Sequence, residues 1–144
     1  MRLHDLVATS GRLSRTSRRL DKIGRLSDLL RRLEPPEIPI GVAYLSGTLP
    51  QGRIGIGPAA LRDGFPRSSA AAPTLTLTEV DETFERMASE SGPGSGARRA
   101  LLLQRLLLRA SREEQDFLAR LVLGELRQGS LQGLMVEAVA RAAG

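Results

Sequence analysis

The stretch ARRALLLQRLLLRA, residues 97–110, indicates the fold class of this 144-residue chain. Its leucines recur at helical spacing and cover more than half of the circumference, so we expect a central helix here. Leu and Ala dominate the apolar residues and only 3% of all residues are aromatic, which favours helices over a sheet. We therefore predict an all-α protein, with one domain over residues 1–144 and about seven to eight helices.

Apolar spacing and helix signals place the other helices. Residues 12–34 are expected to form one long amphipathic helix ended by Pro35-Pro36, and residues 37–46 a second one. Further helices are expected at 58–63, after a Ser111 N-cap, and from about 131 to 143. Residues 64–73 have the composition of a linker.

Residues Thr74–Val80 alternate between polar and apolar like a strand. A single strand would have no partner in this sequence, so we prefer Thr78 as the N-cap of a helix. The buried stripe of that helix would be Val80, Phe84, Met87 and Ala88.

Composition excludes several classes of function. The chain has no cysteine, and hence no disulfide, thiol nucleophile or Cys-ligated metal site, and one histidine, His4, cannot make a histidine cluster. No apolar run approaches the roughly 20 residues that span a bilayer, and no apolar segment near the N-terminus resembles a secretory signal. An organelle transit peptide is the alternative, although Asp5, Asp21 and Asp28 do not fit its acid-poor pattern. We expect a cytoplasmic, nucleoid-associated protein.

The charge of the chain is basic and consists almost wholly of arginine. Lys and Arg number 21 against 16 Asp and Glu, a net charge of +5, and Lys22 is the only lysine. Arginine pairs two-pronged with phosphate, which points to phosphate-bearing partners, although a G+C-rich genome would also favour arginine. Residues 1–34 hold nine basic and four acidic residues, and residues 98–144 eight and five. A fold that joins these two ends would create a continuous basic surface.

A short motif occurs twice, 77 residues apart. Gly47-Thr-Leu-Pro-Gln-Gly52 and Gly124-Glu-Leu-Arg-Gln-Gly129 share the pattern G-x-L-x-Q-G, and each lies between predicted helices. We interpret this as an internal pseudo-two-fold repeat of helix-loop-helix units, with halves at about 12–63 and 79–143. Such glycines would let backbone N–H groups approach a phosphate, with Arg53 and Arg127 adding charge. Alternatively, Gly47 and Gly124 are only the residues that end their helices.

No catalytic constellation is found. Gly55-Ile-Gly57 and Gly92-Pro-Gly-Ser-Gly96 resemble pieces of nucleotide loops, but neither follows a strand or carries the Lys-Ser/Thr of a P-loop. Glu113, Glu114 and Asp116 suit the start of a helix better than acid–base or magnesium chemistry. We predict no catalytic residue and no metal ligand in this chain.

Four stretches resemble the N-terminal region of ATP-dependent DNA ligases of the bacterial, actinobacterial type. They are LHDLVATS (3–10), LSGTLPQGRIGIG (45–57), SGPGSGARR (91–99) and LGELRQG (123–129). The resemblance covers nearly the whole chain. It implies a helical domain that binds the minor-groove side of nicked duplex DNA through loops, in an enzyme that uses ATP and magnesium and acts in DNA replication, repair and recombination.

The resemblance also assigns candidate DNA-binding residues. The family's contacting loops map onto Gly94, Ser95, Gly96, Arg98 and Arg99, and onto Gly124, Leu126, Arg127 and Gly129. Gln51, Gly52 and Arg53 join them by the internal repeat. The ligase nucleophile lies in a K-x-D-G motif, which Lys22 does not match, so the chain is expected to be inactive alone and to work with a ligase catalytic domain in cis or trans. It would then be an excised domain, a truncated product or a stand-alone DNA-binding copy; the competing class is a helical protein-interaction module without DNA affinity.

Overall fold

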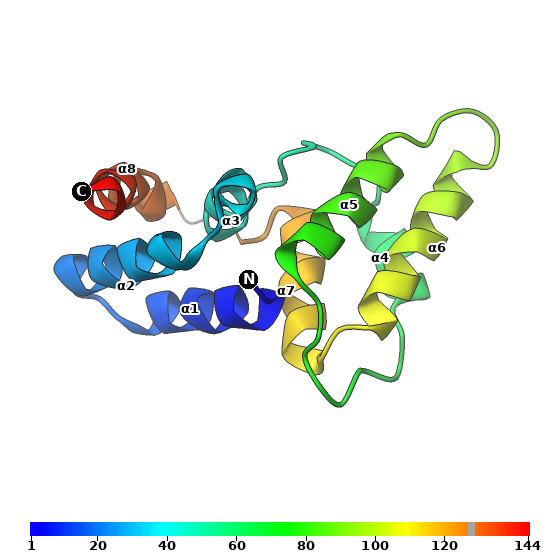
Figure 1. Cartoon of the computed structure of the whole chain (residues 1–144). Coiled ribbons are helices and arrows are strands. Elements are labelled where there is room, and N and C mark those ends of the chain that lie inside the picture. The colour runs from blue at the N-terminus through cyan, green and yellow to red at the C-terminus, as the bar shows by residue number, and fades with distance from the viewer. Residues whose placement is uncertain (127–128) are drawn as a thin grey trace.

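A computed structural model of the chain describes residues 1–126 and 129–144. Within them the chain forms eight α-helices and no strand, so the all-α prediction and the expected number of helices are confirmed (Figure 1). The helices are α1 Leu3–Arg15, α2 Arg19–Arg32, α3 Ile38–Leu45, α4 Pro58–Gly64, α5 Leu77–Ala88, α6 Ser95–Leu108, α7 Arg112–Leu123 and α8 Gly129–Ala143. A short 3-10 turn, Pro35–Glu37, leads into α3. No helix in the described part is long and apolar enough to cross a bilayer.

The helices form two groups that meet at α7 (Figure 1). On one side α1, α2 and α8 lie together, and on the other α5 packs against α6, with α4 behind it. Helix α8 lies along α2, but it brings one arginine, Arg141, beside the basic N-terminal helices, while the arginines from Arg98 to Arg120 lie on α6, α7 and the turn between them. Between the groups, the rings of Tyr44 on α3 and Phe84 on α5 meet edge to face, with centroids 6.4 Å apart.

The long helix predicted for residues 12–34 is wrong, because the chain is extended at Thr16 and Arg18 and divides it into α1 and α2. The Thr16 hydroxyl donates a hydrogen bond to Asp21 at 3.0 Å, which also lowers the pKa of that carboxyl group. Leu20, which would lie on the apolar face of the predicted long helix, is 74% exposed. The sequence also assigned no helix to residues 1–11, although Leu3, Leu6 and Leu13 are buried along α1.

The alternating stretch at 74–80 does have a partner, which is the N-terminus of the chain. Leu3 donates its N–H to the Leu75 carbonyl at 2.9 Å and Leu77 donates to Met1 at 3.0 Å, an isolated antiparallel bridge. The N-cap of α5 is Thr76 and not Thr78, because Thr76 and Glu79 form a reciprocal capping box.

Two other expectations about the central part of the chain differ from the structure. Ala88 is exposed, so the buried stripe of α5 ends at Met87. The leucine-rich helix α6 lies at the edge of the molecule and not at its centre, with Leu101 and Leu108 nearly half exposed (Figure 1). The segment 64–73 is held on α7, since Gln115 donates to the Ser68 carbonyl at 2.9 Å.

Candidate nucleic-acid interface

The two G-x-L-x-Q-G motifs begin with the same backbone turn. Gly47 and Gly124 have φ of +80° and +74°, a left-handed conformation that favours glycine. At the end of α3, the Gly47 N–H donates to the Tyr44 carbonyl at 3.0 Å and the Thr48 N–H donates to the Ala43 carbonyl at 2.9 Å. The end of α7 has the same two bonds, in which the N–H groups of Gly124 and Glu125 donate to carbonyls of the last turn of that helix. Both glycines therefore end helices in Schellman turns, and their N–H groups are occupied within their own helices.

The two turns line one groove, although 77 positions separate them in the sequence. A hollow of about 450 Å³ is lined by Gly47–Leu49, Gly52, Arg53 and Leu121–Gly124. A second hollow of about 440 Å³, lined by Arg53–Pro58, Val122, Leu123 and Glu125, shares Arg53 with the first. We call the two together the loop groove.

Free backbone donors lie in this groove just after the first motif. Gly52 still closes a turn onto Leu49, with φ of +74° and an N···O distance of 2.9 Å. From Arg53 to Gly57, no acceptor among the described residues engages the backbone N–H groups. Gly55 and Gly57 are exposed, as is the Arg53 side chain. Such a run of N–H groups beside a guanidinium group is suited to an anion such as phosphate.

Gln51 has a structural role that the sequence did not reveal. Its side-chain amide donates to Asp81 at 2.8 Å and to Glu85 at 2.7 Å, both on α5. The hydroxyl of Tyr44 is buried nearby, where burial first and Asp81 second raise its pKa. Gln51 therefore fixes the first loop to α5, and its amide nitrogen is already bonded.

The third loop, residues 91–99, is closed on itself by its arginines. Gly94 is left-handed, with φ of +80°, and precedes Ser95 and Gly96 at the start of α6. Arg98 donates to the Glu90 carboxylate at 2.7 Å and to two loop carbonyls, while Arg99 donates to the carbonyls of Met87 and Glu90. Arg99 of this loop lies beside the loop groove, because a Cβ on Gly55 would lie 3.0 Å from its Nη1.

The second motif is described in part. Leu126 is half buried against the core, and Gly129 begins α8. Arg127, predicted as a DNA contact, lies outside the described residues.

Glu114 completes the Ser111 capping box, which confirms its predicted place at the start of a helix.

Comparison with known proteins assigns the chain to a family. Residues 64–140 match the family described as DNA ligase N terminus. The chain is 56% identical to a probable DNA ligase of Anaeromyxobacter sp. (strain Fw109-5), 51% to one of Sorangium cellulosum (strain So ce56) and 49% to one of Mycobacterium avium (strain 104). Each alignment covers 99% of this chain but only 27–28% of the relative. The chain therefore belongs to the DNA ligase family, in the part described as its N terminus.

Proposed function

We propose that this chain is the DNA-binding module of an ATP-dependent DNA ligase and that it holds nicked duplex DNA through backbone contacts in the loop groove. The proposal is carried by the N–H groups of Arg53–Gly57, which no acceptor in the described part of the chain engages. Backbone donors bind phosphate without reading bases, so binding would be independent of sequence. The other predicted residues, from Gly94 to Arg99 and from Gly124 to Gly129, belong to the proposal as further DNA contacts.

Nucleotide chemistry would belong to another part of the ligase. Lys22 lies on α2 without the Asp-Gly of the nucleophile motif, and the relatives extend well beyond the length matched here. ATP and magnesium would therefore act in a catalytic domain that works on the DNA held by this module, at the nucleoid. We further propose that residues 1–144 form one binding unit of two related halves, since both halves supply a turn to the loop groove.

The first test is a titration of labelled nicked and intact duplexes with the 144-residue chain at several salt concentrations. If about five phosphates are neutralised, the logarithm of the affinity should fall with the logarithm of salt at a slope of roughly −4 to −5. The absence of binding to either duplex would overturn the proposal.

A second test removes one groove donor. Gly57 has φ of −90° and ψ of 169°, which proline can approach, and space around its Cβ position is open. Gly57→Pro should weaken binding about ten- to a hundredfold, the worth of one hydrogen bond to a charged acceptor. Gly57→Ala keeps the N–H and should bind within about threefold of the parent. Equal affinities for the two variants, with unchanged helicity, would remove this N–H from the interface.

A further inference from the structure

The net charge of the chain is that of the segment from the start of α1 to the end of α2. Residues 3–32 hold eight basic and three acidic residues, an excess equal to the +5 of the whole chain. The other 114 residues hold thirteen of each sign. Among the described residues, the charged ones that line the loop groove are Arg53 and Glu125, of opposite sign. Most of the long-range attraction for a polyanion should therefore originate on the segment of α1 and α2.

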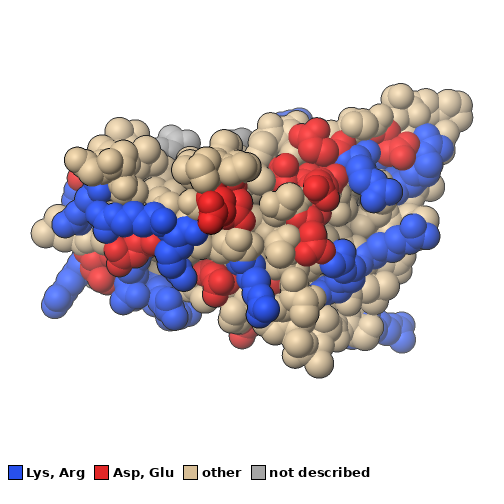
Figure 2. Space-filling model, viewed as in Figure 1, with Lys and Arg blue, Asp and Glu red and all other residues tan. Residues whose placement is uncertain are grey.

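The charges of these helices are exposed and weakly engaged. Lys and Arg side chains gather over α1, α2 and the seam between α2 and α8 (Figure 2). Arg25 and Arg31 pair with Asp21 and Asp28 at 3.3 and 3.4 Å, but these pairs are about half exposed and contribute little. Other arginines of this region are exposed and have no ion pair within the described residues, among them Arg12 on α1, Arg32 on α2 and Arg141 on the adjacent α8.

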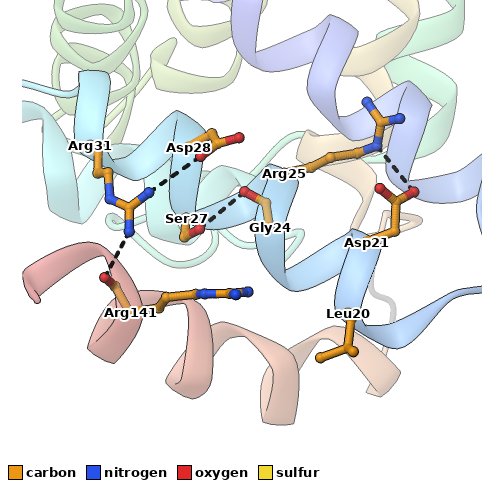
Figure 3. A pocket seen from close by; sticks show the side chains of 8 residues that line it. All are labelled: Leu20, Asp21, Gly24, Arg25, Ser27, Asp28, Arg31 and Arg141. Carbon is orange, nitrogen blue, oxygen red and sulfur yellow. Dashed lines mark hydrogen bonds and ion pairs between the residues drawn. The ribbon is translucent and has the colours of Figure 1, made fainter.

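Two open hollows adjoin along α2 and bring these arginines together. One, of about 560 Å³, lies between α2 and α8 and is lined by Arg25, Arg31 and Arg141 beside the two aspartates. Figure 3 shows Arg31 reaching from α2 to the Arg141 carbonyl at 3.0 Å, while the Arg141 side chain extends between the helices. The other, of about 220 Å³, lies between α1 and α2 and is lined by Arg12, Arg25 and Arg32. Arg25 and Asp28 belong to both hollows.

We propose that this α2 arginine surface (Arg12, Arg25, Arg31, Arg32 and Arg141) is a second phosphate-binding surface, which holds the duplex flank outside the loop groove. The proposal rests on the proposed DNA binding and extends it. It assigns the salt-dependent part of the affinity to these arginines, and the contacts made by protein backbone N–H groups to the loop groove.

The spacing of the surface suits a duplex better than an acidic protein. The 14 residues of α2 extend about 21 Å, a length over which B-DNA presents roughly twelve phosphates. Guanidinium groups line hollows on both sides of this helix, so they can meet a regular row of charges. Arginine can also leave an exposed carboxylate for a phosphate at little cost, since both offer the same two-pronged partner.

The experiment compares three triple variants of the 144-residue chain on a nicked duplex with long flanks, by anisotropy over a range of salt. Arg12→Gln/Arg32→Gln/Arg141→Gln removes three unpaired charges of the surface. The matched control, Arg62→Gln/Arg86→Gln/Arg105→Gln, removes three exposed charges from α4, α5 and α6. The third variant, Arg12→Lys/Arg32→Lys/Arg141→Lys, keeps the charge. Circular dichroism checks that all three remain folded.

We expect the first variant to flatten the salt slope by nearly 3, about 0.9 for each phosphate that is no longer neutralised. The control and the lysine variant should keep the slope of the parent. If the parent binds and the first variant has the same slope, the α2 arginine surface does not touch the DNA, while the proposed function stands. The same result together with capture of an acidic protein would assign the surface to that class of partner instead. If the parent does not bind duplex DNA, both proposals fail.

Discussion

Replacing Gln51 by Glu should destabilise the protein strongly, because it would place a third carboxylate between two others. The Gln51 amide nitrogen lies 2.8 Å from Asp81 and 2.7 Å from Glu85. At these distances each new charge pair repels by about 1.5 kcal/mol even in the dielectric of water, and two hydrogen bonds are removed as well. Rotation of the exposed Glu85 side chain relieves part of this. We expect the free energy of unfolding to fall by about 3 kcal/mol at pH 7, a large share of the stability of a small domain.

Urea denaturation at pH 7 and near pH 4 is the assay. Protonation of the introduced carboxylate at low pH removes the repulsion, so the loss of stability should shrink as the pH falls. Gln104→Glu, on the exposed face of α6, is the matched control and should change the stability by less than about 0.5 kcal/mol. A Gln51→Glu protein as stable as this control at pH 7, or a deficit that does not depend on pH, would refute the view that Gln51 fixes the groove loop to α5.

Three further predictions concern the backbone and the N-terminus. Gly124→Ala should lower the free energy of unfolding by about 1–2 kcal/mol, measured by urea denaturation, because φ at this position is +74°, although space for a Cβ is open. Gly24→Ala inside α2, where space is also open, should instead raise the free energy of unfolding by up to about 1 kcal/mol. Thr76→Ala should lower stability by about 1 kcal/mol through loss of the α5 cap, and a neutral result would exclude that role. Burial raises the pKa of Glu37, but its bond with the Met1 ammonium group outweighs this and lowers it overall. Glu37→Gln should therefore lower the free energy of unfolding most at pH 7. The difference from the parent should close as the pH falls below the ordinary glutamate range and through the lowered pKa of Glu37, where that carboxylate becomes protonated in the folded parent.

The helices that the sequence predicted well are those whose signals are local. Ser111 and Glu114 stand three residues apart before an apolar run, and they form the capping box of α7. The same logic applied to Thr78 failed, because Thr76 with Glu79 is the better pair and only the structure shows Met1 bonded to Leu77 beside it. The break between α1 and α2 was hidden because Leu13 and Leu20 are seven residues apart, a spacing that also suits one continuous helix.

The sequence pointed to two of the turns that line the loop groove, but which groups in the groove are available depends on tertiary structure. The repeat drew attention to Gly47 and Gly124, and both do occupy turns at one groove. Their N–H groups, however, are used by their own helices, a possibility that the sequence left open. That the free donors lie at residues 53–57 depends on a segment with neither helix nor partner strand, for which no propensity gives a signal. The meeting of the two turns depends on how α3 and α7 end in space, which no local pattern encodes.

The net charge of the chain and the loop groove belong to different segments, so the proposed module would use two kinds of contact to recognise DNA. The described lining of the loop groove holds one positive and one negative side chain, so we expect its contribution to come from backbone hydrogen bonds and to vary little with salt. The α2 arginine surface acts over the Debye length, about 8 Å at physiological salt, and weakens as salt rises. Any preference for a nick should therefore persist at high salt while the total affinity falls. If the preference disappeared in step with the affinity, discrimination would lie on the arginine surface, and the two surfaces would not have separate roles.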